Sequence, residues 1–153
     1  MAIAALDLGR RRIGVAVTDA AAIAAHPLGI VERRALARDL DAIAAMLRDR
    51  DITTIVVGLP LNMDGSEGPA ARSARNFAAQ LGAALGASVE MFDERLSSFE
   101  ARERMRGVAV TNRVKKKSKR PAIDAIAAAV ILEGWMQARA EKILRENSDR
   151  SKD

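Results

Sequence analysis

The stretch Ala4–Ala20, AALDLGRRRIGVAVTDA, decides the fold because it joins two apolar runs through one short polar turn. The runs are Ile3–Leu8 and Ile13–Thr18, and the intervening Gly9–Arg12 completes a pattern that predicts a β-hairpin. Asp7 lies inside the first run. An unpaired carboxylate in a buried strand costs roughly several kcal/mol, even after relaxation. Asp7 therefore indicates a functional site rather than a packing position.

The composition restricts the chemistry that such a site can use. The chain has 153 residues, of which 49% are hydrophobic, and this suits one domain with a sizeable core. It has no cysteine and one histidine, which excludes disulfides and thiolate sites and argues against an imidazole-based zinc site. A metal site in this chain must use oxygen ligands, and such ligands favour Mg²⁺ or Mn²⁺.

Hydrophobic periodicity along the rest of the chain predicts alternating strands and helices. We expect strands over Pro27–Val31, Thr53–Val57 and Val89–Phe92, helices over 35–50 and 74–85, a short helix from Ser97 to about Arg106, and a buried helix from Pro121. Three antiparallel strands followed by βα units predict an α/β fold. The expected fold has a mixed five-stranded sheet, in the order βββαβαβαα, with helices on both faces.

Residues 1–140 are predicted to form a single domain, because they contain neither a linker nor an internal repeat. Residues 141–153 are predominantly polar and are predicted to be a frayed tail. The N-terminus has no basic segment ahead of its apolar residues, and no apolar run approaches the roughly 20 residues that a membrane span needs. We therefore expect a cytoplasmic protein without membrane contacts.

Acidic residues occur at three points that this fold can bring together. Asp7 lies in the first strand, Asp93 and Glu94 follow the last strand, and Asp124 lies in the first turn of the buried helix. Functional groups of open α/β sheets gather at strand ends and the adjoining helix starts. Converging carboxylates persist when a cation neutralises them. Two metal ions about 4 Å apart, bridged by a shared acid, could then clamp a phosphodiester.

Each acid also has an ordinary explanation, although the explanations differ in strength. The helix dipole favours Asp124 near a helix N-terminus. Asp93 and Glu94 could be turn residues paired with Arg95. Asp7 is harder to explain in this way because it lies inside a strand, so the predicted site depends on the combination of acids.

Basic residues are concentrated ahead of the last helix. The chain has a formal net charge of +5, and the span from Arg102 to Arg120 holds nine basic residues and one acid. Such a segment predicts contact with a polyanion, although a solvated loop is an equal alternative on charge alone. The candidate nucleic-acid contacts are Arg11, Arg12, Asn62, Arg95, Lys115, Lys116, Lys117, Lys119 and Arg120.

Four motifs resemble the YqgF/RuvX family in order and spacing: DLGRRRIGVAVTD, VVGLPLNMDGSEG, DERLSS and KKKSKRPAIDAIAAAVIL. The resemblance covers nearly the whole chain and implies a ribonuclease-H-like domain, related to Holliday-junction resolvases of the RuvC type. Members are assigned to a nuclease that matures the 5′ end of pre-16S ribosomal RNA. By resemblance, Asp7, Glu94 and Asp124 take the catalytic and metal-binding positions. The neighbouring Asp93 is the alternative to Glu94 as a metal ligand. One departure is that Ser97 and Ser98 stand where the family often has threonines.

The resulting hypothesis is a hydrolase that cleaves phosphodiester bonds of structured nucleic acid, an endonuclease dependent on Mg²⁺ or Mn²⁺. Ribosomal precursor RNA is the favoured substrate. Two alternatives stay open, a Holliday-junction resolvase acting on branched DNA and a non-catalytic nucleic-acid-binding module. The chain could be a monomer or a homodimer, since a resolvase that cuts two strands symmetrically needs a twofold dimer.

Overall fold

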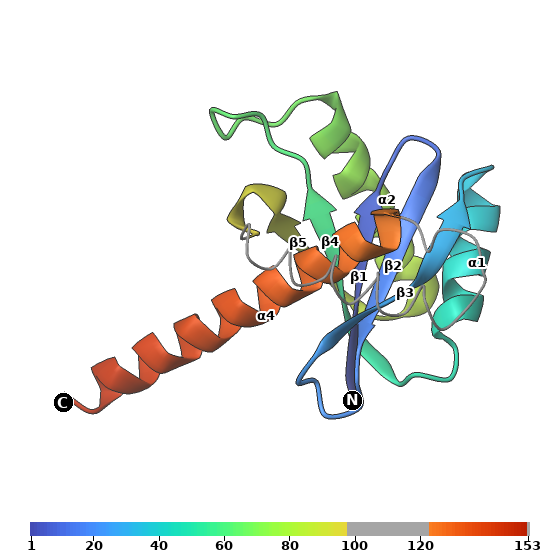
Figure 1. The fold of residues 1–153 in the computed structure, drawn as a ribbon. Coiled ribbons are helices and arrows are strands. Elements are labelled where there is room, and N and C mark those ends of the chain that lie inside the picture. The colour runs from blue at the N-terminus through green and yellow to red at the C-terminus, as the bar shows by residue number, and fades with distance from the viewer. Residues whose placement is uncertain (98–122, 153) are drawn as a thin grey trace.

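The computed structural model describes residues 1–97 and 123–152. Figure 1 shows the elements, which follow in chain order: β1 (Ala2–Leu8), β2 (Arg12–Thr18), β3 (Ala25–Glu32), α1 (Leu36–Leu47), β4 (Ile52–Leu59), α2 (Pro69–Leu85), β5 (Ser88–Asp93), the 3₁₀ turn η1 (Glu94–Leu96) and α4 (Ile123–Arg150). The short helix expected between Ser97 and Arg106 and the start of the last helix at Pro121 lie outside the described residues, apart from Ser97 itself.

The strands form one five-stranded sheet in the order β3-β2-β1-β4-β5. β1 and β2 pair antiparallel, as do β2 and β3, whereas β4 is parallel to both β1 and β5. The predicted hairpin and the predicted mixed sheet are therefore confirmed. β1 lies at the centre because the hairpin supplies one neighbour and the α1 crossover returns β4 to its other side.

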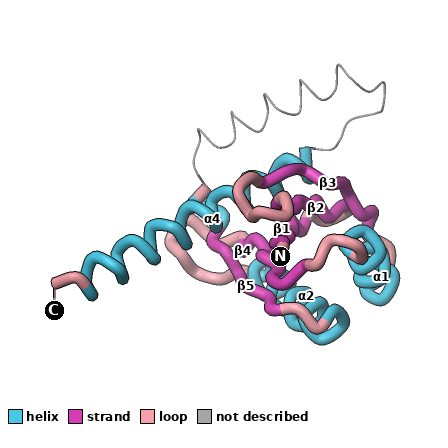
Figure 2. Tube along the Cα trace, turned by 90° about the horizontal axis from the view of Figure 1, so that it is seen from below, coloured by secondary structure: helices cyan, strands magenta, loops and turns pink. Residues whose placement is uncertain are grey.

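Helices cover both faces of this sheet, as predicted. Alternating side chains of each strand point to opposite faces, and Leu6, Val15 and Val57 pack with α1 and α2. Ala5 and Val56 point the other way and pack with α4. Figure 2, seen from below, shows α1 and α2 on one side of the strands and α4 on the other.

Small residues allow α4 to approach the sheet very closely. An added Cβ at Gly14 would lie 1.8 Å from the main-chain oxygen of Asp124, so that position has no room for any side chain. Ala5 and Ala16, which pair across β1 and β2, are fully buried beneath the same helix. The start of α4 is thereby fixed against the hairpin, directly over the row of residues that contains Asp7.

α4 is longer than the sequence predicts. A polar frayed tail is expected from residue 141, but the helix continues through Arg150 and its second half extends away from the sheet (Figure 1). The side chains of residues 141–150 are exposed, which explains their polar composition without requiring loss of helical structure. Among the described helices, none is both long and apolar enough to cross a membrane.

We predict that Gly14→Ala destabilises the protein, because the new methyl group would collide with main-chain atoms of α4 that cannot move independently of the helix. Overpacking of this kind costs about 1–3 kcal/mol, and sometimes more. Gly29→Ala on β3 is the matched control, since its methyl group would meet only the flexible end of Met46 at ordinary contact distance. Chemical denaturation of the three proteins measures the difference, and equal stability of both variants would contradict the close packing.

Candidate active site

Asp7 faces α4 from the last part of β1. It pairs with Gly14 across the antiparallel ladder, and directly opposed residues point to the same face. The β1 residue two positions earlier, Ala5, is buried under α4. The half-buried Asp7 carboxylate therefore lies in the layer between the sheet and the first turn of α4, where Asp124 also lies.

The Glu94 carboxylate reaches the same layer from the end of β5. An added Cβ at Gly58 of β4 would lie 2.5 Å from Glu94 Oε1 and 2.7 Å from the Ile131 side chain. Gly58 therefore leaves the space that the Glu94 side chain occupies beside α4. Gly14 and Gly58 lie on the two strands that flank β1, so the absence of a side chain on each makes room around Asp7.

The pKa of Asp7 is affected by burial and by two neighbouring acids, Glu94 and Asp124. Burial raises the pKa of Asp7, the negative charge of Asp124 raises that pKa further, and a hydrogen bond with the Glu94 side chain acts in the opposite direction. Two carboxyl groups in such contact hold either a shared proton or a cation between them. The three predicted acids are thus neighbours, with Asp7 and Glu94 in contact and Asp124 acting on Asp7 through its charge.

Asp93 is directed elsewhere, because neighbouring residues at the end of a strand point to opposite sides. Its carboxylate accepts hydrogen bonds from Arg95 Nη2 at 2.7 Å, Arg95 Nε at 3.0 Å and the Arg95 main-chain N–H at 3.0 Å. These contacts hold the pKa of Asp93 below its usual value. Of the two acids at this strand end, Glu94 is therefore the one beside Asp7.

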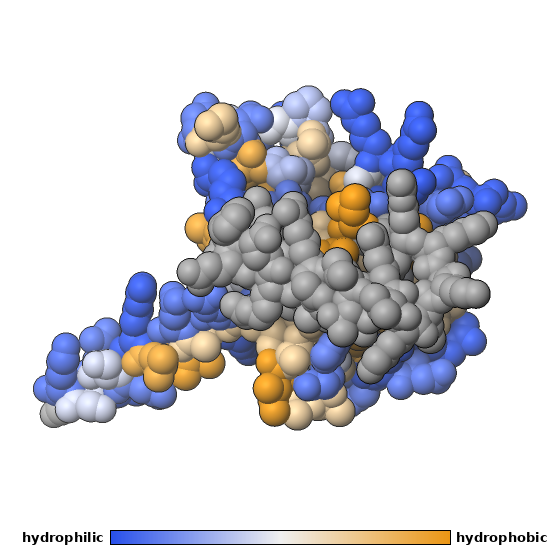
Figure 3. All heavy atoms as spheres, viewed as in Figure 1, coloured by the Kyte–Doolittle hydropathy of each residue, from blue (hydrophilic) through white to orange (hydrophobic). Residues whose placement is uncertain are grey.

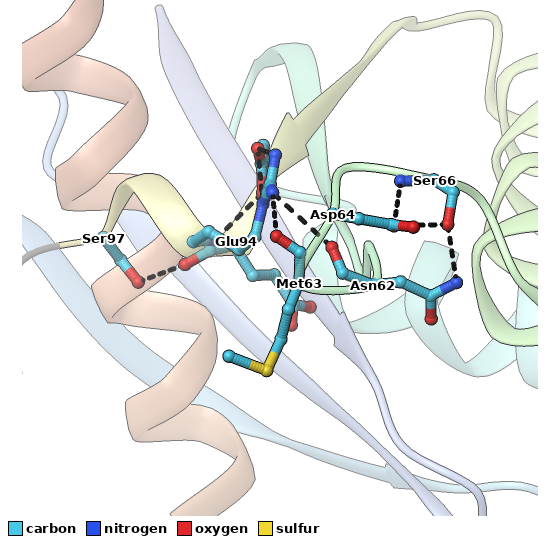
Figure 4. Close-up of polar contacts among 8 residues, drawn as sticks. Asn62, Met63, Asp64, Ser66, Glu94 and Ser97 are labelled. Atoms are coloured by element: carbon cyan, nitrogen blue, oxygen red, sulfur yellow. Dashed lines mark hydrogen bonds and ion pairs between the residues drawn. The ribbon is translucent and has the colours of Figure 1, made fainter.

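Arg95 also fixes the loop between β4 and α2. Its Nη1 donates to the main-chain oxygens of Met63 at 3.3 Å and Asn62 at 3.5 Å. Figure 4 shows this loop lying beside η1, with Asn62, Met63, Asp64 and Ser66 on one side and Glu94 and Ser97 on the other. The Arg95 guanidinium, which is predicted to contact nucleic acid, therefore holds this loop while its side chain stays exposed to solvent.

Asn62 joins the two ends of the same loop through hydrogen bonds to Ser66. Its side-chain nitrogen donates to Ser66 Oγ at 2.9 Å, and its main-chain N–H donates to the Ser66 oxygen at 2.9 Å. Asp64 accepts the Ser66 main-chain N–H, and the hydrogen bonds from Ser66 lower the pKa of Asp64. The loop is an ordered platform held at the edge of the acidic site, and Met63 at its tip is 99% exposed.

The arginine turn between β1 and β2 is exposed and firmly held. Arg11 and Arg12 present their side chains to solvent, while Arg33 donates from its main chain to the Arg11 oxygen and from Nη1 to the Gly9 oxygen, both at 2.8 Å. The predicted phosphate-binding arginines therefore stand on a fixed turn that begins two residues after Asp7. The remaining basic candidates, Lys115, Lys116, Lys117, Lys119 and Arg120, lie outside the described residues.

The sequence analysis missed Arg33 and its partner Asp39. Asp39 is only 4% exposed, accepts the Arg34 main-chain N–H at 2.9 Å, and lies 4.0 Å from Arg33 Nε. The Arg33 guanidinium also lies over the Phe77 ring, 5.6 Å from its centre. The available signal was an acid on the buried stripe of α1, where Asp39 precedes Ile43 and Leu47 at helical spacing.

The donor set fits a hard divalent cation. Mg²⁺ is commonly held by one or two carboxylates together with waters and substrate phosphates, and the contacting Asp7 and Glu94 provide such a pair. Among residues 1–97 and 123–152, no three His, Asp or Glu side chains are gathered closely enough to hold a metal ion. The geometry thus supports a two-carboxylate site and does not bring Asp124 into a three-ligand group.

Comparison with known proteins identifies the family. Residues 1–138 match the sequence profile of RuvX, described as Holliday junction resolvase. This chain belongs to the RuvX family. A relative from Anaeromyxobacter dehalogenans (strain 2CP-C), named as a candidate nuclease of pre-16S rRNA, is 56% identical over 135 residues, which cover 88% of this chain and 96% of the relative. A relative of the same name from Myxococcus xanthus (strain DK1622) is 44% identical, with 87% and 85% of the two chains covered.

Solved structures confirm the fold of this RuvX family member. RuvC from T. thermophilus in complex with a Holliday junction substrate superposes with a TM-score of 0.54 at 17% identity, over 90% of this chain and 96% of RuvC. The Fowlpox virus resolvase in complex with Holliday junction DNA gives 0.54 at 10% identity, over 90% and 98%. The predicted ribonuclease-H-like fold and, at the level of the family, the predicted nuclease class are confirmed.

We predict that Asp7→Asn leaves this RuvX protein at least as stable as wild type in EDTA. The raised pKa of Asp7 means that the folded state disfavours its ionised form, and the amide removes that charge without creating a cavity. Mg²⁺ should stabilise wild type by about 2.7 kcal/mol at a hundredfold excess over Kd, and the variant much less. Thermal melting of both proteins in EDTA and in Mg²⁺ measures these differences.

The control is Asp41→Asn, which removes an exposed carboxylate from α1 on the other face of the sheet. This variant should respond to Mg²⁺ as wild type does. A destabilised Asp7→Asn protein, combined with no effect of Mg²⁺ on wild type, would show that Asp7 is an ordinary structural acid.

Proposed function

We propose that this chain is a divalent-metal-dependent endonuclease that cleaves structured nucleic acid, with the precursor of 16S ribosomal RNA as its substrate. The observation that carries the proposal is the contact between Asp7 and Glu94 in the layer under α4, next to the charge of Asp124. Such crowding of acids disfavours the folded state unless a cation occupies the site. Selection for a bound cation is therefore the simplest physical reason for Asp7 to be in β1.

Asp7 and Glu94 would hold Mg²⁺ or Mn²⁺ through their carboxylate oxygens. When bound, the metal would supply Lewis-acid stabilisation of charge on a phosphodiester and lower the pKa of a coordinated water. Asp124 adds negative charge from the first turn of α4, which strengthens the attraction of the site for a cation. Packing of α4 on Gly14 limits the access of bulk water from the sheet side.

The exposed arginine turn would bind the phosphates next to the bond that is cut. Guanidinium groups bind phosphate oxygens through paired hydrogen bonds, and Arg11 and Arg12 lie at the end of the strand that carries Asp7. The contacts of Arg33 with both ends of this turn keep it in place. On the other side of the site, Arg95 would hold the loop over Asn62–Gly68 in place beside the acids.

The names of the relatives favour RNA over branched DNA as substrate. The proteins with 44–56% identity are named for pre-16S rRNA, whereas the proteins solved with Holliday junctions are 10–17% identical and support the fold alone. Cleavage of branched DNA remains the second candidate because the family description names it. A purely binding module is disfavoured, since binding alone gives no reason to retain contacting acids.

We predict that the pure protein cleaves ribosomal precursor RNA in the presence of Mg²⁺ or Mn²⁺ and is inactive in EDTA. Asp7→Asn and Glu94→Gln should each lower the rate by on the order of 10² or more, as expected when a charged group acting on the reacting phosphate is lost. Asp93→Asn should cost less, because Asp93 contacts Arg95 instead of Asp7. Gel assays with precursor RNA and a four-way DNA junction, run side by side, measure all four proteins.

Asp41→Asn serves again as the control and should retain wild-type rates. Full activity of Asp7→Asn would rule out the proposed site. Cleavage of the four-way junction but not of precursor RNA would transfer the assignment to branched DNA, and binding without cleavage of either substrate would leave only the binding module.

We predict separately that the basic segment contributes electrostatic affinity. Replacing Lys115, Lys116, Lys117, Lys119 and Arg120 together by alanine should weaken binding about equally for different sequences. The slope of log affinity against log salt should become shallower by about 0.7–0.9 for each phosphate contact that is lost. Fluorescence anisotropy at several salt concentrations measures the slope, and an unchanged slope would identify the segment as a solvated loop.

A further inference from the structure

The second half of α4 extends past the sheet and carries exposed apolar side chains. Ile143 and Leu144 are 48% and 69% exposed on this part of the helix. In Figure 3, hydrophobic atoms lie midway along the extension and again on the body near its base. The family match ends at residue 138, so Ile143 and Leu144 lie beyond the part of the chain that the match covers.

Two hollows lie along this extension, and Ile143 borders both. The larger has a volume of about 1190 Å³ and lies between α4 and the body, lined by Met136 and Ile143 on one side and by Met1 and Ile23 on the other. The smaller, of about 420 Å³, is lined by Trp135 and Ile143 among others. Helices pack by fitting the side chains of one helix into the grooves beside the side chains of the other, so the hollows beside Ile143 can accept side chains of a second helix.

The body side of the larger hollow is built on an ordered loop. Asp19 Oδ1 accepts the Ile23 main-chain N–H at 2.8 Å, and the Asp19 main-chain oxygen accepts the Ala22 N–H at 2.9 Å. These bonds hold Ile23 at 77% exposure on the rim of the hollow. Exposed apolar side chains on both walls of one hollow mark a surface suited to association.

We propose that the occupant is a second copy of this chain, docked through an antiparallel pair of α4 helices. Ile143 borders both hollows, and both are lined partly by α4 and partly by the body, so a second copy can place its own α4 against this α4 and the hollows beside it. That property is the condition for a twofold interface. With the two Ile143 side chains packed together, the last turns of each α4 fill the larger hollow of the other copy. This interface is independent of the proposed catalytic function.

The order of charges along α4 fits the antiparallel arrangement. Arg139 precedes Ile143 by one turn and Glu146 follows it by one turn, so all three lie on one face. When two such faces meet head to tail, Arg139 of each copy lies beside Glu146 of the other, which gives two ion pairs related by the twofold axis. In the single chain, Arg139 stacks on Trp135 with 5.0 Å to the ring centre, and Glu146 has an exposed contact with Lys142 at 3.9 Å. A parallel pair would instead oppose like charges.

The test is sedimentation velocity of the full chain over a concentration series. Wild type should sediment as a dimer that dissociates on dilution. Ile143→Asp should be a monomer, because it places two like charges at the centre of the interface. Met63→Asp is the matched control: it also replaces an exposed apolar residue, on the β4–α2 loop, which lines neither hollow, and it should remain a dimer.

Charge exchange makes the test specific for the antiparallel register. Arg139→Glu and Glu146→Arg should each be monomeric, because each places like charges at both ion pairs. Mixing these two variants should restore the dimer as a heterodimer, and the chain carrying both changes should dimerise with itself. Wild type that stays monomeric at every concentration would overturn the proposal. Loss of association without recovery in the mixture would overturn it equally.

Discussion

The packing of the first turn of α4 against Gly14 is the contact on which the rest of the structure depends. At Gly14, the backbone of α4 occupies the space that a side chain of β2 would fill, so no larger residue fits at this position. The helix start thereby lies directly over β1, and its Asp124 comes within electrostatic reach of Asp7. The same close packing forms the part of the hydrophobic core between the sheet and α4, where alanines of the sheet pack with alanines of the helix. Fold stability and the acidic site therefore depend on one interface.

The hairpin, the sheet and the two helical layers could be predicted because each follows from local periodicity. Asp7 could be singled out for the same reason, since a single acid within an apolar strand breaks the pattern. The sequence does not show which of the two adjacent side chains, Asp93 or Glu94, points toward β1, because that depends on how the end of β5 packs. The structure answers that question through Gly58, whose missing side chain leaves the space for Glu94.

Other features were beyond sequence reasoning because they depend on distant partners. Arg33 and Asp39 come together with Phe77 only after β3, α1 and α2 have packed, so their role at the arginine turn has no local signature. The same is true of Arg95, which joins Asp93 to the loop at Met63, a contact between segments far apart in the sequence. The polar composition of residues 141–150 predicts fraying, but the same composition also suits an exposed helix, and α4 continues to Arg150.

The length of α4 sets the distance between the acidic site and the proposed dimer interface. At about 1.5 Å per residue, Ile143 lies about 28.5 Å along the helix from Asp124. A dimer centred on Ile143 therefore holds its two acidic sites roughly 57 Å apart along the paired helices. That separation corresponds to about 17 base pairs of duplex at 3.4 Å each. Two sites so placed would reach cleavage points on well-separated parts of a folded nucleic acid.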